Sequence, residues 1–453
     1  MTRYRLLPLF SALLLCLALA ACGGKEQPSA RAGVPVYTGP PCMDALTLAQ
    51  DLGAYAPAAG GSTPLVSPAE QEAAAARQKA ALFKPWSMTR ASRWVQQSLA
   101  RDFNMKPDKA FTEGKQPFPL DQWQRMVANS NKGAYGKDAG PGITLRHTDL
   151  RAMPGSMRYY LRPDLPGEGY PFDYLQHTSL PPGTPVYICN VSADGLWLLA
   201  ESALSAGWIP AQDAARTDEA FMNDWQSRPL AALIKDHTAV GEVAGHIGTL
   251  LPLAGGGSGA GGADAVLYPR RGFSGGAEAA TAELLPGSAT LVPMPLSPAN
   301  VARVGNEMMA QPYGWGGLDE KRDCSALTRD LMTPFGLFLP RNSARQAKAG
   351  MPVEVAGMTN TEKEAAIIRG AVPFRSLVWM PGHIGLYLGV HNGKALMYHN
   401  MWGLRTRDAA GGCDGRAVVG KAVVTTLRPG VERPDLCNPG SFLDRIERAV
   451  VLP

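Results

Sequence analysis

The spacing of apolar positions changes twice along the chain and divides it into a helical, a strand-rich and a mixed part. Over residues 68–104 and again over 120–127, apolar residues recur at helical intervals. From about residue 142 to residue 297, short β-branched and aromatic runs alternate with turn residues, which predicts many short strands. Beyond that point helical spacing comes first and strand alternation follows, so we expect an α+β domain over residues 298–453.

The strand-rich part contains one distinctive phrase. Trp197 stands in a strand-like run, and after a tight turn the chain continues with Gly207-Trp208-Ile209. This phrase resembles bacterial SH3-like domains, which implies small β-barrels. We expect a first SH3-like domain over residues 141–225 and, by analogy, a second over residues 226–297. A partly helical N-terminal domain at residues 62–140 precedes them.

The mixed part holds the residues with the clearest chemical signal. Cys324 follows a turn-rich run at residues 312–317 and begins a predicted helix. The positive end of the helix dipole and the first-turn N–H groups favour a thiolate over a thiol at this position. The same N–H groups suit the oxyanion of a tetrahedral intermediate.

Two histidines are expected to meet beside this cysteine. His383 begins a strand whose alternation places Gly385 on the same face, away from the apolar residues. Asn392-Gly393 predicts a hairpin, and His399 ends the second strand, where it would lie beside His383. A nucleophile, a base and a group that orients the base are the parts of a cysteine peptidase. His391, next to the turn, is the alternative for the third role.

These segments together resemble the NlpC-type family of papain-like cysteine peptidases. The family signature is Pro-Tyr-x-Trp-Gly-Gly, Asp-Cys-Ser-Gly and His-Val-Gly-Ile-Tyr-Leu-Gly, with a further His at the end of the next strand. The resemblance implies a papain-like catalytic domain over residues 298–453, with Cys324, His383 and His399 as the catalytic triad. A Pro-Arg-x-Ser-x-x-Gln motif follows. The substrate-binding residues that the resemblance implies are Tyr313, Asp323, Ser325 and Ser343.

The resemblance also implies a substrate. Relatives with SH3-like domains ahead of this catalytic domain typically cleave the bond between γ-D-glutamate and a diamino acid, often diaminopimelate, in peptidoglycan stem peptides. We therefore expect a γ-D-glutamyl-L-diamino acid endopeptidase without a cofactor. We expect no metal at His383, His391 and His399, because no carboxylate or second thiol stands at recognisable ligand spacing. A related acyl-transfer enzyme and a non-catalytic wall-binding lipoprotein remain alternatives.

The first 61 residues are typical of an address and a tether. Arg3 and Arg5 precede a short apolar run, and small residues stand directly before Cys22. This arrangement resembles the bacterial lipoprotein cleavage box and implies a signal peptide over residues 1–21 with a lipidated Cys22. Residues 22–61, rich in Gly, Pro, Ala and Ser, are expected to form a lipid-anchored tether. We therefore expect an exported, membrane-anchored lipoprotein that faces the periplasm or cell wall.

The tether bears on whether the substrate is intact or released peptidoglycan. A long reach toward the wall favours a cell-wall lysin. The alternative is a recycling peptidase that acts only on released stem peptides. In that case a carboxylate in the acidic loop at residues 164–173 would pair with the free N-terminus of the peptide, and the candidates are Asp164, Glu168 and Asp173.

Composition adds two points. The hydrophobic content of 45% and the charged content of 18% are those of a globular protein, and a net charge of +5 does not indicate nucleic-acid binding. We expect a monomer. Five cysteines remain after the signal peptide and Cys22, and in an oxidising compartment an odd number indicates one free thiol, for which Cys324 is the natural choice. Cys413 and Cys437 are close in sequence and could pair, and Cys42 with Cys189 would then be the other pair, but the sequence does not fix the connectivity.

Overall fold

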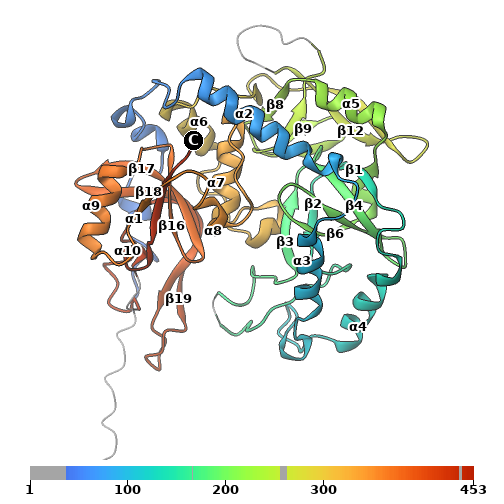
Figure 1. The fold of residues 1–453 in the computed structure, drawn as a ribbon. Helices are drawn as coiled ribbons and strands as arrows, with labels where there is room; N and C mark the ends of the chain where they lie inside the picture. Colours follow the sequence, from blue (N-terminus) through green and yellow to red (C-terminus); the bar gives the residue numbers. More distant parts are fainter. Residues whose placement is uncertain (1–36, 166, 256–262, 438–440) are drawn as a thin grey trace, which may run out of the picture.

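The structure is a computed structural model that describes residues 37–165, 167–255, 263–437 and 441–453 (Figure 1). The predicted signal peptide and the predicted lipidation site, Cys22, lie outside these residues. Among the described residues, no helix is both long enough and apolar enough to cross a membrane. The predicted fold class is confirmed: a helical N-terminal part, SH3-like β-structure and a papain-like α+β domain follow one another along the chain.

The N-terminal part is helical up to residue 135, and its longest helix is α2 (Pro68–Phe83). Ser67 and Glu70 form a capping box at its start, and the alanine-rich sequence that follows has high helix propensity. The other elements of this part are α1 (Asp44–Thr47), α3 (Arg93–Phe103), α4 (Leu120–Asn129) and the 3₁₀ turns η1 (Leu52–Ala54), η2 (Pro57–Ala59), η3 (Lys84–Ser87), η4 (Pro107–Lys109) and η5 (Lys132–Ala134).

Helix α2 joins the catalytic domain to the strand-rich part. Gln71 donates to the carbonyl of Met294 at 2.5 Å, and Gln78 donates to the carbonyl of Thr333 at 3.0 Å. Just beyond the helix, the indole of Trp86 donates to the carbonyl of Gly142 at 2.7 Å. Figure 1 shows α2 running across the top of the molecule from α6 to the SH3-like strands.

The expectation of a free tether over residues 22–61 is wrong for its second half. Asp44 accepts hydrogen bonds from the backbone and hydroxyl of Thr426, and Gln50 bonds both backbone groups of Val424. Leu52 is fully buried in the core of the catalytic domain. Residues 37–61 therefore belong to the folded body. Their turn-rich composition reflects an irregular path along the surface rather than a linker.

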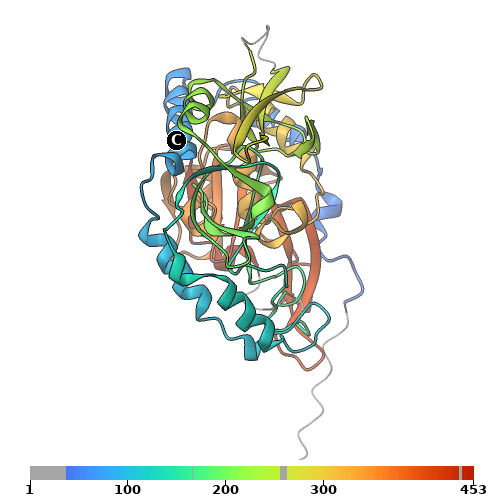
Figure 2. The ribbon, with the colours of Figure 1, turned by 90° about the vertical axis from the view of Figure 1, so that its right-hand side faces the viewer.

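The first SH3-like domain is a seven-stranded antiparallel sheet with the order β3-β2-β6-β5-β4-β1-β7. Its strands are β1 (Gly140–Thr144), β2 (Thr148–Arg151), β3 (Gln176–Leu180), β4 (Pro185–Val191), β5 (Trp197–Glu201), β6 (Ala206–Pro210) and β7 (Ala214–Arg216), with the turn η6 (Ala211–Asp213). Trp208 is buried against Val95 of α3. Figure 2 shows the teal helices flanking the green strands of this domain.

The second SH3-like domain follows α5 (Glu219–Ser227) and consists of short antiparallel pairs. Its strands are β8 (Leu230–Leu233), β9 (Thr238–Val240), β10 (Val243–Gly245), β11 (Leu250–Pro252), β12 (Ala265–Arg271), β13 (Ala277–Glu283) and β14 (Ala289–Leu291). Its core also contains Ile143 and Leu145 of the first domain and Phe83 of α2. The first barrel therefore contributes side chains to the core of the second, while Leu150, Val186 and Ile209 belong to a separate core of its own.

The catalytic domain packs helices on a six-stranded antiparallel sheet with the order β15-β20-β16-β17-β18-β19. Its helical elements are α6 (Pro298–Glu307), η7 (Trp315–Glu320), α7 (Cys324–Met332), η8 (Thr333–Phe335), α8 (Ser343–Gln346), α9 (Asn360–Gly370) and α10 (Phe442–Arg445). Its strands are β15 (Met351–Glu354), β16 (Ser376–Met380), β17 (His383–His391), β18 (Lys394–Thr406), β19 (Gly415–Thr426) and β20 (Arg448–Val451).

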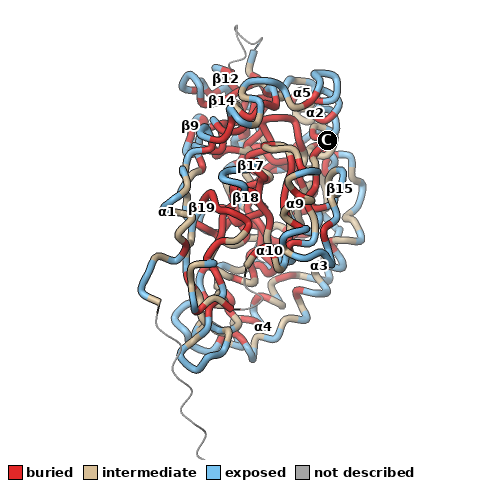
Figure 3. The backbone as a smooth tube through the Cα atoms, turned by 90° about the vertical axis from the view of Figure 1, so that its left-hand side faces the viewer, coloured by how far each residue is buried: buried red, intermediate tan, exposed pale blue. Residues whose placement is uncertain are grey.

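The alternation along β17 sorts its side chains onto two cores. Ile384 and Leu386 pack with Leu327 and Leu331 of α7, whereas Tyr387 packs on the opposite side. Figure 3 shows β17 and β18 as buried segments enclosed by more exposed helices. This alternation brings the start of α7 to the start of β17, where the predicted nucleophile and base lie.

One of the two expected disulfides is present. Cys413 and Cys437 are bonded, with their Cα atoms 5.9 Å apart. The pairing of Cys42 with Cys189 is wrong, because both thiols are free and buried in different cores. Cys42 packs beneath the catalytic sheet and Cys189 in the first SH3-like domain. We expected Cys42 and Cys189 to form a disulfide because two cysteines remained. Each thiol is instead buried in its own core, away from the other.

Candidate active site

Cys324 is the first residue of α7, as the sequence predicted. Asp323 caps the helix by accepting the backbone N–H of Ala326 at 2.8 Å. The thiol is only 7% exposed. Backbone N–H groups of Ile384 and Ser325 point at its sulfur and lower the pKa of the thiol, so the start of β17 and the first turn of α7 both contact it.

The expected thiolate is not the favoured state of this buried cysteine. Burial, followed by the negative charge of Asp323, raises the pKa of Cys324 to about 12. The helix N-terminus acts in the predicted direction, but loss of water around the sulfur outweighs it. The resting nucleophile is therefore a neutral thiol that needs a base.

His383 and His399 form that base and its support. Nε2 of His383 lies 2.7 Å from Nδ1 of His399, as the Asn392-Gly393 hairpin predicted. Burial lowers the pKa of His383 to about 3 and that of His399 well below its usual value. Phe442 covers both rings, at 5.2 Å and 5.5 Å between centroids. Both imidazoles are therefore neutral near pH 7.

Thr425 fixes which nitrogen of each ring carries the proton. Its hydroxyl donates to the carbonyl of Thr426 at 2.7 Å, so its oxygen accepts from Nε2 of His399 at 3.0 Å. Nδ1 of His399 is then an acceptor, and His383 donates to it through Nε2. The lone pair on Nδ1 of His383 is left for the thiol. The sequence did not reveal Thr425, because no motif marks it and strand β19 was not predicted.

His391 does not compete for the third role. It is exposed at the far end of β17, where it pairs with Lys394 and lies 6.0 Å from the ring of Tyr55. It stands eight positions after His383 along the strand, a distance of about 26 Å. The extra length of this hairpin therefore lies away from the site.

Asp323 and Ser325 hold the active-site helix in place. Asp323 accepts from Ser325 Oγ at 3.0 Å and from the N–H of Gly316 at 3.1 Å, and it forms a buried ion pair with Arg341. Arg341 also donates to Ser325 Oγ at 2.8 Å and to Thr178 of the first SH3-like domain at 2.7 Å. We expected substrate contacts from Asp323 and Ser325, but their side chains are occupied within the protein. The Pro-Arg motif was the signal for Arg341, and its partner was not apparent from sequence.

Tyr313 and Ser343 lie on two sides of the thiol's helix. Tyr313 is buried, and the nearby Cys324 and the loss of water raise the pKa of its phenol well above 10. Its neutral hydroxyl is therefore a hydrogen-bond donor. Ser343 is half-buried at the start of α8, which Asn342 caps.

The first SH3-like domain places aromatic side chains against the site. Phe172 lies 6.0 Å from Tyr313, 5.3 Å from Trp315 and 5.7 Å from Trp402, measured between ring centroids. Tyr170 of the same loop donates its hydroxyl to Asp319 at 3.0 Å. The loop at residues 164–173 therefore packs on the catalytic domain beside Tyr313, which lies near the thiol of Cys324.

Of the three acidic candidates in this loop, Glu168 has the most suitable position. Asp173 is fully buried and paired with Arg151 at 3.0 Å, so it cannot meet a peptide amine. Asp164 forms an exposed ion pair with Arg162. Glu168 is half-buried and accepts from Tyr174, whose ring faces Trp315 of the catalytic domain.

Four segments of the chain match known protein families. Residues 11–135 match the N-terminal NLPC_P60 stabilising domain, residues 158–210 an SH3 domain of SH3b1 type, residues 218–256 an SH3 domain of SH3b2 type, and residues 310–413 the NlpC/P60 family. No curated protein matches the chain.

Solved structures agree with this domain series. The chain is similar to an NlpC/P60 endopeptidase from Photobacterium damselae subsp. piscicida, with 23% identity and a TM-score of 0.78 over 89% of this chain and 96% of that one. It is also similar, at 16% identity and a TM-score of 0.43, to an NlpC/P60 family protein from Bacillus cereus, over 69% of this chain and all of that one. The first likeness supports the shared fold of the whole body.

Proposed function

Because the chain carries an NlpC/P60 domain behind two SH3 domains and the stabilising segment of that family, we propose that it is a cysteine endopeptidase that cleaves the γ-D-glutamyl–diamino acid bond of peptidoglycan stem peptides. The observation that carries the proposal is that Cys324 begins α7 beside the N–H of Ile384, next to His383, whose ring is hydrogen-bonded to His399. Diaminopimelate is the expected diamino acid.

The reaction begins with transfer of the thiol proton to Nδ1 of His383 as sulfur attacks the amide carbon. We expect first-turn N–H groups of α7 to stabilise the oxyanion and the neutral hydroxyl of Tyr313, which lies near Cys324, to bind substrate. His383 then gives its proton to the leaving amine, and a thioester remains on Cys324. Water deprotonated by His383 attacks the thioester and frees the γ-D-glutamate carboxylate and the thiol.

Two findings favour a recycling peptidase, which acts on released stem peptides, over a lysin, which acts on the intact wall polymer. The aromatic contacts of Phe172 narrow the approach to a thiol that is already 7% exposed. The expected tether is also shorter, since residues 37–61 pack on the catalytic domain. Glu168 is then the candidate partner for the free N-terminal amine of the peptide.

The test compares two substrates with one enzyme preparation. We expect the purified protein to cut L-Ala-γ-D-Glu-diaminopimelate at the γ-glutamyl bond, as read by mass spectrometry, and to leave purified sacculi intact. Glu168→Gln should raise KM for this peptide more than it lowers kcat. An N-acetylated peptide should be a poor substrate for the parent. Solubilised sacculi would establish the lysin reading instead, and absence of any cleavage would refute the peptidase.

The location is a separate part of the proposal. Small residues before Cys22 support a lipid anchor on an exported, monomeric protein. We expect the wild-type protein in the membrane fraction with a diacylglyceryl mass on Cys22, and Cys22→Ala protein unprocessed or released. Wild-type protein in the soluble fraction without lipid would contradict the anchor.

A further inference from the structure

A second group of histidines lies between the domains. It is separate from His383 and His399, which we call the catalytic pair. His237 and His246 come from the second SH3-like domain and Glu320 from the end of η7, and their donor atoms all lie within 4.8 Å of one another. Nε2 of His246 is 3.1 Å from Oε2 of Glu320, and the two histidine rings are 4.8 Å apart. We call these residues the interdomain cluster.

The geometry of the interdomain cluster points to a metal site, and we propose that His237, His246 and Glu320 bind a zinc ion. Two imidazoles and a carboxylate are a usual donor set for zinc, and ligand atoms on a tetrahedral zinc lie about 3.4 Å apart. His237 and Glu320 are exposed while His246 is buried, so an ion can enter from solvent and be held from within. Both exposed residues adopt the left-handed backbone conformation, with φ of 53° and 59°.

A supporting carboxylate stands behind the buried ligand. Oδ1 of Asp236 lies 3.9 Å from Nδ1 of His246. Asp236 is itself held by two hydrogen bonds from Arg322, at 2.7 Å and 2.8 Å, and by the N–H of Ile247 at 2.8 Å. Metal-binding histidines almost always direct their second nitrogen at such an oriented acceptor.

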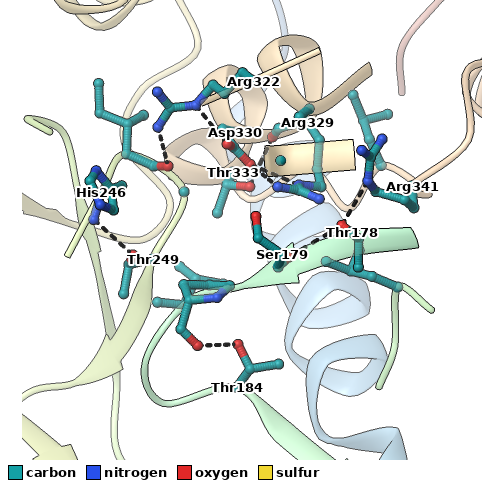
Figure 4. A pocket seen from close by; sticks show the side chains of 18 of the residues that line it. Thr178, Ser179, Thr184, His246, Thr249, Arg322, Arg329, Asp330, Thr333 and Arg341 are labelled. Carbon is teal, nitrogen blue, oxygen red and sulfur yellow. Dashed lines mark hydrogen bonds and ion pairs between the residues drawn. The ribbon is translucent and has the colours of Figure 1, made fainter. Parts of the chain in front are cut away.

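The charges around the cluster favour a cation over an anion. The cluster borders a pocket of about 90 Å³ between both SH3-like domains and the catalytic domain (Figure 4). Each lysine or arginine that lines it already has a carboxylate partner: Lys321 has Asp319, Arg322 has Asp236 and Asp330, Arg329 has Asp330, and Arg341 has Asp323. Glu320 has no such cationic partner among the described ion pairs beyond His246.

His147 of the first SH3-like domain provides the independent sign of a missing ligand. Both of its ring nitrogens are buried without a hydrogen-bond partner, and its ring lies 5.3 Å from that of His246. A buried imidazole with two unpaired nitrogens is costly unless something binds there. His147 is not one of the three residues whose donor atoms lie within 4.8 Å of one another, but its unpaired nitrogens leave an unmet need for a partner beside His246.

A zinc ion at this place would connect three domains. Glu320 stands shortly before Cys324. Arg322 donates hydrogen bonds both to Asp236, which lies beside the cluster, and to Asp330 of α7. The ion would therefore fasten the second SH3-like domain to the segment that leads to the nucleophile. This inference does not depend on the substrate of the enzyme.

The test uses tag-free Cys324→Ala protein, so that the active-site thiol cannot bind metal. The protein is stripped on a chelating resin, equilibrated with micromolar zinc chloride and analysed for metal content and melting temperature. We expect one zinc per chain and a higher melting temperature than for the stripped protein. Adding His237→Ala should abolish both effects, and adding Glu320→Gln should weaken binding at least tenfold.

His391→Ala in the same background is the matched control, because it removes an exposed histidine far from the cluster. It should bind zinc like its parent. His237 is also exposed, so its alanine variant should keep the melting temperature of the stripped parent, which shows that it is folded. No zinc bound to the parent, or equal zinc bound to the His237→Ala protein, would overturn the proposal.

Discussion

The catalytic pair, His383 and His399, and the interdomain cluster differ in how completely the nitrogens of their histidines are satisfied. In the catalytic pair, hydrogen bonds run in one direction from His383 through His399 to Thr425, and a single lone pair is left over. In the interdomain cluster, the neighbouring His147 has two nitrogens without a partner. The first arrangement is prepared to move a proton, whereas the second is prepared to hold a ligand.

The largest effect is expected at the nucleophile. Cys324→Ala should reduce kcat/KM by about 10⁴-fold or more, because no thioester can form. Cys324→Ser should be nearly as inactive, since burial leaves the hydroxyl protonated and His383 is then a poor match for it. Peptide hydrolysis with each purified variant is the measurement. Substantial turnover by the alanine variant would end the covalent mechanism.

The two histidines of the catalytic pair should differ from each other. His383→Ala should lose about 10³-fold or more in kcat, since it removes the base. His399→Ala should lose about 10- to 100-fold, since it removes only orientation. His391→Ala serves as the control and should retain full kcat. Equal losses for His391→Ala and His383→Ala would contradict the assignment.

Arg341 tests the support beneath the nucleophile. Arg341→Met leaves Asp323 buried without its cation, which should lower the free energy of unfolding by about 3–5 kcal/mol. The matched control is Arg345→Met, an exposed arginine of α8, which should change the free energy of unfolding by under about 1 kcal/mol. Urea unfolding of both variants measures the change in the free energy of unfolding. Similar changes for the two variants would show that the ion pair of Arg341 with Asp323 does not stabilise the site.

Thr425 tests the direction of the hydrogen bonds. Thr425→Val keeps the shape but removes the acceptor for His399, and kcat should fall about tenfold, the equivalent of one hydrogen bond. Thr425→Ser should restore most of the rate. The rescue separates positioning from packing, because serine lacks the methyl group but keeps the oxygen. If Thr425→Ser is as slow as Thr425→Val, the hydroxyl of Thr425 does not determine the tautomer of His399.

The last prediction concerns the stability of the folded protein in acid. His383 and His399 have lower pKa values in the folded protein than the ordinary 6.5, so unfolding takes up protons at low pH. Their contribution to stability is present above pH 6.5 and falls by about 1.4 kcal/mol per pH unit and group as the pH drops towards their folded values. Melting temperatures between pH 7.5 and 4.5 measure it. The His383→Gln, His399→Gln double variant should show a flatter dependence than the wild type.

The catalytic pair could be predicted from sequence, and the interdomain cluster could not. His383 and His399 lie on adjacent strands joined by Asn392-Gly393, so alternation and one turn signal were enough to bring them together. The residues of the cluster come from separate domains, and their positions depend on how these domains pack. Phe172 was hidden for the same reason, since its aromatic partners are more than 100 residues away along the chain.

Local sequence features also led to wrong predictions where burial decides the outcome, namely for the ionisation of Cys324 and the packing of residues 37–61. A helix N-terminus and an alanine- and proline-rich segment are local features, and they suggested a thiolate at Cys324 and a free chain over residues 37–61. Both conclusions fail because solvent exclusion is a property of the assembled body: the thiol is dehydrated and the segment is covered by the catalytic domain. Fold class and site residues followed from pattern, whereas ionisation and docking did not.

The docking of residues 44–52 on strand β19 has a consequence for how the molecule assembles. Gln50 and Val424 are 374 residues apart, and Asp44 and Thr426 are 382 apart. Contacts of such high contact order require closure of a very long loop and form slowly. Residues 44–52 therefore have no docking site until strand β19, which lies close to the end of the chain, has formed. A chain that stops before β19 would leave this N-terminal segment without a docking site.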